Sequence, residues 1–303
     1  MKKEHAKKVK MSKSDIVFQG VTYAVFSLLI VVFAYPFYYL LISTISDNQM
    51  VDMNKVFLYP IGINFRNYIE VFKLDKMRSA ALVSVARTVL GTSLSVVATS
   101  YMAYFFTKDD MWHKKLWYRL VVSTMYFSAG LIPAYLNIKM LGLLNTFWIY
   151  VLPGCLGAYN LILVKTFMES LPGSLEESAE IDGAGYLTRF IRIVLPLSKP
   201  ILATIALFCA VSHWNSMFDT KLYISDTKLY TLQFVLYEYQ QQVKSIQEYL
   251  VGMGMEDANM ASASSTTALR LTMTAVTVAP IMCVYPFIQK YYMKGMMLGA
   301  VKG

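Results

Sequence analysis

The sequence has few charged residues for its length. Asp, Glu, Lys and Arg make up 16% of the 303 residues, whereas apolar residues make up 56%. About a quarter of a soluble domain is charged, so this composition argues against a soluble protein. Six stretches of at least nineteen residues carry no charge, and they lie between Asp15 and Asp47, Arg87 and Lys108, Arg119 and Lys139, Lys139 and Lys165, Lys199 and Asp219, and Arg270 and Lys290. A membrane-spanning helix needs roughly twenty mostly apolar residues, so we expect an all-α integral membrane protein with six transmembrane helices.

Cysteine and histidine are also scarce. Cys155, Cys209 and Cys283 stand singly in apolar stretches, and the three histidines are scattered. This spacing predicts neither a disulfide nor a metal site. No glycine is followed by lysine, which excludes the GxxxxGK[ST] loop that binds nucleotide phosphates. We therefore expect no catalytic residue, no metal and no cofactor on this chain.

The net charge of +9 is unevenly distributed along the chain. We place the N-terminus in the cytoplasm and let six helices cross the membrane. The cytoplasmic segments then hold seventeen Lys and Arg and nine acidic residues, whereas the outside segments hold ten Lys and Arg and ten acidic residues. Lys and Arg favour the cytoplasmic side of membrane proteins. The bias predicts a multi-pass protein with both termini in the cytoplasm. It favours contact with membrane lipid over contact with nucleic acid.

The predicted helices divide the chain into three parts. A basic cytoplasmic tail covers residues 1–15, the first helix and an outside loop cover residues 16–77, and a five-helix core covers residues 78–303. The first apolar stretch is too long for a signal peptide, and no small-x-small cleavage site follows it, so we expect it to remain as a span. Near the outer end of its helix, Arg87 is expected to reach to the membrane interface.

The six spans are expected at residues 16–46, 78–107, 117–140, 146–168, 193–214 and 269–292. Helical spacing within the outside loop 215–269 predicts a further helix at residues 232–250.

A short polar segment, residues 169–192, lies between two of the apolar stretches. Across its end the chain reads Glu177-Ser178-Ala179, three residues, Gly183, nine residues, and Ile193-Val194-Leu195-Pro196. Ser174 followed by Glu177 is typical of a capping box at the start of a helix, and Gly183 and Gly185 are typical of a helix end. The pattern predicts a short exposed helix, which is either a plain surface helix or a docking element.

This spacing resembles the cytoplasmic signature of ABC-importer permeases, which reads Glu-Ala-Ala, three residues, Gly, nine residues and Ile-x-Leu-Pro. The one departure is Ser178, where the pattern usually has alanine. The chain as a whole is similar to the maltose-permease-like family of carbohydrate importers, and in particular to an oligosaccharide subgroup of Gram-positive bacteria. Three further runs carry this resemblance: residues 213–219, residues 222–230 and the C-terminal Ala300-Val301-Lys302-Gly303.

The resemblance implies a type I ABC importer permease fold with a cytoplasmic coupling helix in the bacterial cell membrane. It also implies a second homologous permease subunit, two ATPase subunits that bind ATP and Mg, and an extracellular solute-binding lipoprotein. The function is then import of a carbohydrate, an oligosaccharide, with ATP hydrolysed by another chain. The residues expected to couple the permease to the ATPase are Glu177, Ser178, Ala179, Asp182, Gly183, Ala184, Gly185, Ile193, Leu195 and Pro196.

Polar and aromatic residues within the predicted spans are candidates for the substrate pathway, because polar groups in a membrane are costly and often functional. Sugars stack on aromatic faces and hydrogen-bond to amides. Helix–helix hydrogen bonds and an interfacial aromatic belt are the alternative roles for each residue. The candidates are Tyr101, Tyr126, Ser128, Tyr135, Asn137, Asn160, Trp214 and Asn215.

Three other functions are alternatives to sugar import. An importer permease for a peptide, polyamine or phosphate would carry the same signature. An ion-coupled secondary transporter would place several charged residues deep in its spans, but only Arg87 lies deep in a predicted span, and no acidic residue does. A membrane enzyme would need a convergent set of His, Asp, Glu or Ser residues, and the sequence shows none.

Overall fold

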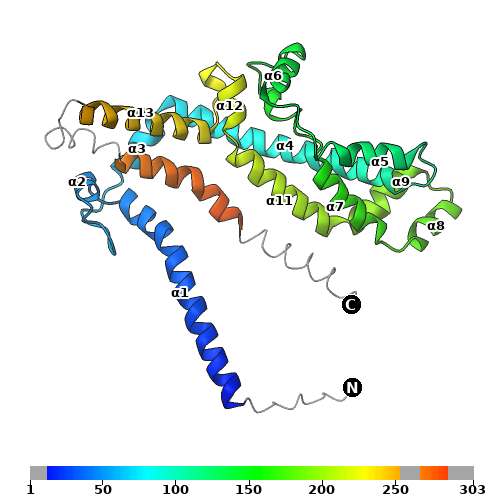
Figure 1. The fold of residues 1–303 in the computed structure, drawn as a ribbon, viewed down its shortest axis with the longest axis horizontal. Coiled ribbons are helices and arrows are strands. Elements are labelled where there is room, and N and C mark those ends of the chain that lie inside the picture. Colours follow the sequence, from blue (N-terminus) through cyan, green and yellow to red (C-terminus); the bar gives the residue numbers. More distant parts are fainter. Residues whose placement is uncertain (1–11, 253–266, 286–303) are drawn as a thin grey trace. The chain divides into compact units, whose positions relative to one another are not determined.

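The computed structural model describes residues 12–252 and 267–285, and these residues form helices joined by loops, with no β-strand among them (Figure 1). The predicted helical class is therefore confirmed. By its internal contacts the chain divides into two compact units, residues 1–68 with 250–275, and residues 69–249 with 276–303.

The first unit contains the longest exposed apolar helix. This helix, α1, runs over Lys13–Thr44 with a mean hydropathy of 2.3 in its most apolar window, and no residue of that window is buried. A helix of 32 residues is long enough to cross a bilayer, and its bare apolar surface needs lipid around it. The first predicted span is confirmed, and Pro36 lies inside the helix without ending it.

Two short helices follow α1, namely α2 at Asn48–Asp52 and α3 at Arg66–Lys73. The chain between them returns to α1, since the hydroxyl groups of Tyr35 and Tyr38 donate to the carbonyl oxygens of Phe57 and Leu58 at 3.3 and 2.5 Å. These bonds satisfy the polar ends of two tyrosines whose rings lie on an apolar helix.

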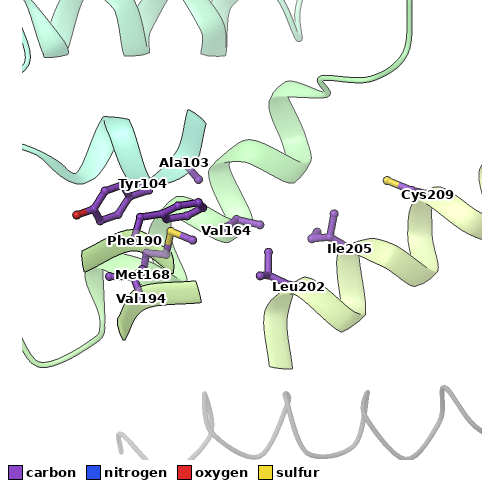
Figure 2. Packing of buried hydrophobic residues seen from close by; sticks show 9 residues of the cluster. All are labelled: Ala103, Tyr104, Val164, Met168, Phe190, Val194, Leu202, Ile205 and Cys209. Carbon is purple, nitrogen blue, oxygen red and sulfur yellow. The ribbon is translucent and has the colours of Figure 1, made fainter. Parts of the chain in front are cut away.

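The second unit is built around three helices, α4 at Asp75–Thr107, α7 at Ala158–Glu169 and α11 at Lys199–Asn215. Small residues on α4, including Gly91, allow the helices to approach closely, as is common between membrane helices. A Cβ added at Gly91 would lie 2.5 Å from Nε2 of His213 on α11. Their shared core is shown in Figure 2; its buried side chains are Ala103, Tyr104, Val164, Met168, Phe190, Val194, Leu202, Ile205 and Cys209.

Shorter elements complete the second unit. Between α4 and α7 lie α5 (Lys114–Ser123), α6 (Leu131–Met140) and the 3-10 turn η1 (Phe147–Tyr150). Between α7 and α11 lie α8 (Ser174–Ile181), α9 (Tyr186–Arg189), the π-helical turn η2 (Phe190–Val194) and α10 (Leu195–Leu197). After α11 come α12 (Phe218–Tyr223), the 3-10 turn η3 (Thr227–Leu229) and α13 (Leu232–Gly252). Helix α13 confirms the helix predicted at residues 232–250.

Two predicted spans, residues 117–140 and 146–168, are wrong as continuous helices. The first is broken between α5 and α6, where Gly130 has a φ of +84° and Pro133 follows three residues later. The second is broken at residues 151–157, which include Pro153. Proline lacks the amide hydrogen that a helix needs and its ring clashes with the carbonyl one turn earlier, so an apolar stretch containing it need not be one helix.

The fifth predicted span, residues 193–214, is also not a single straight helix. The segments Tyr186–Leu197 and Lys199–Asn215 meet at an angle of 80° around Ser198. Pro200 is the second residue of α11, so it cannot donate a helical hydrogen bond to residue 196, and the chain bends there.

Three helices of the described residues are long and apolar enough to cross a membrane, and the bent pair would make a fourth. They are Lys13–Thr44, Asp75–Thr107 and Thr267–Tyr285. The last of these confirms the beginning of the sixth predicted span, while residues 286–292 and the predicted C-terminal run lie outside the described residues.

Candidate functional site

The predicted docking element is a real, exposed helix. Helix α8 has no buried residue, and its first turn carries Glu176 and Glu177. Acidic side chains at a helix N-terminus interact favourably with the helix dipole. The predicted capping box is wrong, because the N-cap position is Gly173 and no side chain caps it, which leaves Ser174 as the first helical residue.

Helix α8 ends in a Schellman motif, which explains the glycine of the signature. The amide of Gly183 donates to the carbonyl of Glu180 at 2.9 Å, and the amide of Ala184 donates to the carbonyl of Ala179 at 2.9 Å. Gly183 has a φ of +81°, a conformation that residues with a side chain rarely adopt. The predicted turn at Gly183 is confirmed, and three signature residues together form one helix end.

Two acidic residues of α8 are held by the rest of the protein. Glu176 forms an ion pair with Lys108, which follows the last residue of α4. Glu180 pairs with Arg189 of α9, Nη1 to Oε2 at 2.6 Å, and only 6% of the Arg189 side chain is exposed. The ion pairs fix α8 against α4 and α9 from one side.

The remaining acidic signature residues face outward. Glu177 and Asp182 are exposed, and neither has an ion-pair partner among the described residues. Ser178 is exposed as well, and its hydroxyl donates to the carbonyl of Ser174 at 2.8 Å within α8. Helix α8 and its C-cap thus offer two unpaired carboxylates, and the helix also exposes the apolar side chains of Leu175 and Ile181.

The second half of the signature leads into the bent helix. Ile193 and Leu195 are half-buried, and Leu195 packs against the core of Figure 2. Pro196 is the second residue of α10, where its missing amide hydrogen is tolerated. Gly185 precedes α9 with a φ of −70°. The signature residues therefore form one continuous path from exposed α8 to the partly buried η2 and on to α10.

A cavity of about 800 Å³ lies in the second unit beside α4 and α11. Its lining mixes aromatic, amide, hydroxyl and charged groups; it comprises Arg87, Ser95, Ala134, Asn137, Ile138, Ile149, Tyr150, Pro153, Gly154, Tyr159, Asn160, Phe208, Cys209, Ser212, His213, Ser216, Asp219 and Tyr223. Ligand pockets combine an aromatic or apolar lining with a few polar groups, and this volume lies within their usual range of roughly 300–1,000 Å³.

Only some of the sequence-predicted pathway residues reach this cavity. Asn137 and Asn160 line it, and Asn160 donates to the sulfur of Cys209 at 3.5 Å. The ring of Tyr135 stacks on that of Tyr223, a lining residue, with centroids 5.9 Å apart and planes 17° apart. These three residues come from α6 and α7, so the structure brings together one part of the predicted set.

The other predicted pathway residues lie elsewhere. Tyr101 packs edge-on against Phe190 at 5.7 Å and lines a separate cavity of about 320 Å³. Tyr126 and Ser128 are exposed in the break between α5 and α6. The buried Trp214 donates to the carbonyl of Thr277 at 3.0 Å, and the exposed Asn215 accepts from Gln233 at 3.3 Å.

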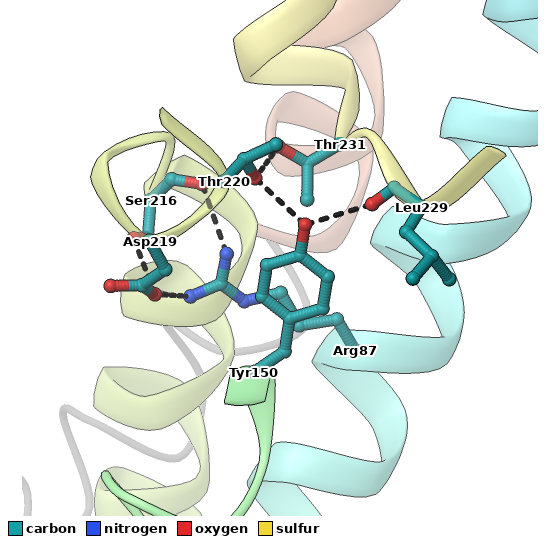
Figure 3. Close-up of polar contacts among 7 residues, drawn as sticks. All are labelled: Arg87, Tyr150, Ser216, Asp219, Thr220, Leu229 and Thr231. Atoms are coloured by element: carbon teal, nitrogen blue, oxygen red, sulfur yellow. Dashed lines mark hydrogen bonds and ion pairs between the residues drawn. The ribbon is translucent and has the colours of Figure 1, made fainter. Parts of the chain in front are cut away.

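The expected position of Arg87 at the membrane interface is wrong. Its side chain is 3% exposed, and its guanidinium forms an ion pair with Asp219 of α12 (Figure 3). The guanidinium also donates to the carbonyl of Ser216 at 3.2 Å and lies 4.6 Å from the ring centroid of Tyr150. A buried charge needs such partners, and a partner more than 130 residues away in sequence is not visible to local pattern reading.

Sequence reasoning missed Arg87, Tyr150, His213 and Asp219 as cavity residues. One signal was available, since Arg87 is the one charge far from the ends of a predicted span, and such charges face the interior of a bundle and pair with another group. The described residues contain no group of three or more His, Cys, Asp or Glu that could hold a metal ion.

A helical protein with apolar spans, a polar cavity and an exposed acidic helix is the arrangement of a membrane transport permease. Residues 6–297 match the family described as binding-protein-dependent transport system inner membrane component, so this chain belongs to that family. It is a membrane-embedded permease and not an enzyme, and in ABC importers ATP is hydrolysed by a separate subunit.

Curated relatives agree with this assignment. The polygalacturonan/rhamnogalacturonan transport system permease protein YtcP of Bacillus subtilis (strain 168) is 39% identical, over 88% of this chain and 92% of that protein. Protein LplC of the same organism is 38% identical, over 88% of this chain and 89% of that protein.

A solved structure also resembles this chain. A bacterial ABC transporter involved in the import of the acidic polysaccharide alginate contains a chain with a TM-score of 0.83 and 27% identity. The match covers 94% of this chain and 100% of that one. The ABC permease fold therefore holds for nearly the whole chain.

Proposed function

We propose that this chain is one permease subunit of an ATP-driven importer that passes an oligosaccharide through the cavity beside α4 and α11. The observation that carries the proposal is the lining of that cavity. Asn137 and Asn160 contribute amides that both donate and accept hydrogen bonds, and Tyr159 and Tyr223 contribute aromatic rings. Sugars need both kinds of contact, and the curated relatives include permeases named for polygalacturonan/rhamnogalacturonan and for melibiose, raffinose and stachyose.

The proposed assembly contains a second homologous permease, two ATPase subunits that carry ATP and Mg, and an extracellular binding protein that delivers the sugar. A related alginate transporter was solved together with a pentasaccharide-bound periplasmic protein. Six spans, with both termini and the α8 loop in the cytoplasm, are the topology we propose. The long connection over residues 215–269 would then face the binding protein.

In this proposal α8 is the coupling helix. Glu177 and Asp182 are exposed and take no part in the ion pairs that hold α8, so they can meet basic groups of an ATPase. The side chains of Ala179 and Ala184 are small and Gly183 has none, so a docking groove can enclose this segment. Motion of the ATPase would pass through α9, η2 and α10 to α11, which lines the cavity.

Uptake by the reconstituted importer tests the pathway. Proteoliposomes containing the permease pair and the ATPases receive binding protein saturated with radiolabelled trigalacturonate, an alginate trisaccharide or raffinose. We expect ATP-dependent uptake of at least one of these sugars, and a several-fold loss of that uptake in Asn160→Leu. Asn215→Leu is the matched control, because Asn215 is exposed and away from the cavity. Uptake of none of the sugars by the wild-type assembly would contradict carbohydrate import.

A further inference from the structure

We infer that the carboxylate of Asp219 accepts a hydrogen bond from a hydroxyl group of the passing sugar, and that Arg87 acts as the positioning residue for this carboxylate. The inference rests on the proposed function, and it adds which chemical group of the sugar the site recognises. That feature is a free sugar hydroxyl and not the sugar's charge.

The two oxygens of Asp219 have different surroundings (Figure 3). Oδ2 accepts from Nη2 of Arg87 and from the hydroxyl of Ser216, the latter at 3.1 Å. Oδ1 has no hydrogen-bond partner among the described residues, and 34% of the side chain is exposed where Asp219 lines the cavity. One oxygen is thus fully occupied by the protein, while the other keeps its acceptor capacity for a molecule in the cavity.

Arg87 cannot serve the substrate in the same way. Its side chain is 3% exposed, one nitrogen is taken by Asp219, and another donates to the carbonyl of Ser216. The ring of Tyr150 covers the guanidinium, and its hydroxyl contacts Thr220 at 2.9 Å and donates to the carbonyl of Leu229 at 2.8 Å. These contacts hold both terminal nitrogens of Arg87 and leave only its Nε without a partner among the described residues, so at the wall of the cavity the cation orients the carboxylate of Asp219.

The pairing also decides what kind of sugar passes. A lone carboxylate would repel a uronate, but the Arg87–Asp219 pair has no net charge, and the amides of Asn137 and Asn160 are neutral. A charged acceptor forms a stronger hydrogen bond with a hydroxyl than a neutral one does. We therefore expect the site to select for free hydroxyl groups and to tolerate both acidic and neutral rings.

The test compares sugars that differ only at the feature in question. The full reconstituted importer, with its binding protein saturated, is given trigalacturonate, its carboxyl-reduced counterpart and its O-methylated counterpart. For the wild type we expect carboxyl reduction to change uptake less than about threefold and O-methylation to lower it about tenfold, since a charge-assisted hydrogen bond is lost. Equal uptake of the parent and O-methylated sugars by the wild type would overturn the inference without touching the proposal of carbohydrate import.

Variants then assign the preference to this residue pair. Because the binding protein is the same in every assay, a preference that changes with the variant comes from the permease. The double variant Arg87→Gln with Asp219→Asn removes both charges together, so neither is left buried alone, and Asp219→Asn keeps the shape of the residue that meets the sugar. We expect the tenfold preference for free hydroxyls to fall to about twofold in the double variant. The single variant Asp219→Asn should show the same twofold preference.

The control and the contrary outcome use the same readout. Asp226→Asn changes the same chemistry outside the cavity, where Asp226 caps the amide of Lys228 at 2.9 Å, and should keep the wild-type preference. If the double variant also keeps the tenfold preference, the Arg87–Asp219 pair stabilises the fold and does not bind the sugar hydroxyl. Uptake of no sugar by the wild type would remove the proposed function and this inference with it.

Discussion

Lys108, immediately after the last turn of α4, forms an ion pair with Glu176 on α8, and the same ammonium group lies 4.2 Å from the ring centroid of Tyr104. The pair joins the exposed acidic helix to the helix that carries Arg87 and lines the cavity. The side chains of Lys108 and Glu176 are only 18% and 22% exposed, so water screens their attraction less than it does at the surface. The contact is a direct physical link between the proposed docking surface and the proposed pathway.

The first prediction concerns this link. Lys108→Glu and Glu176→Lys should each lower the amount of sugar imported per ATP hydrolysed, because like charges then face each other between α4 and α8. The double charge swap should restore most of the ratio. The measurement is uptake and phosphate release in the same proteoliposomes. Lys114 and Asp109, a pair 3.0 Å apart in which the Asp109 side chain is 99% exposed, give the control, since swapping them should change little. A double swap as poor as the single variants would contradict the link.

The second prediction separates charge from shape at Glu177. No side chain caps α8, so Glu177→Gln loses only the charge, while Glu177→Lys reverses it. At a partly desolvated contact with a basic partner, the reversal should weaken ATPase binding by on the order of 2 kcal/mol or more, and the neutral change by less. Co-purification of the ATPase with the permease measures this. Lys228→Glu, a reversal far from α8 in sequence, is the control. Wild-type binding by Glu177→Lys would show α8 to be a plain surface helix.

The third prediction uses two glycines with the same open surroundings. An added Cβ meets nothing within 4 Å at either Gly183 or Gly185, but only Gly183 has a positive φ. Gly183→Ala should cost about 1 kcal/mol at the end of α8 and lower transport, because an alanine disfavours the left-handed turn. Gly185→Ala should be nearly neutral. Uptake assays on both variants decide this, and equal behaviour of the two would mean that the Schellman turn is unimportant for coupling.

The fourth prediction tests the proposed topology. In a background with the three native cysteines replaced, a single cysteine at position 177 should be protected from a membrane-impermeant maleimide added to intact cells, and one at position 228 should react. Both native side chains are exposed, so a difference in labelling reports the side of the membrane and not burial. Labelling of position 177 in sealed cells would place α8 outside and overturn its role as a cytoplasmic coupling helix.

Much of the fold and of the docking helix was readable from the sequence, because the deciding interactions are local. The apolar length of α1 and α4, the helical spacing of α13 and the glycine at the end of α8 all act within a few turns of chain. The broken helices were missed for a different reason. A long stretch without charge does not show where a helix breaks, and Pro153 and Pro200 remove backbone hydrogen bonds at the places where the chain breaks or bends.

The cavity was decided by the tertiary structure. Arg87 and Asp219 are 132 residues apart, and Asn137 and Asn160 come from different helices, so no local pattern shows that these four residues line one space. The sequence by itself determined that the chain is a helical membrane protein with an exposed signature helix, since composition and short-range spacing suffice for both. Which polar residues meet depends on how α4, α7 and α11 pack, and a buried charge finds its partner only once that packing exists.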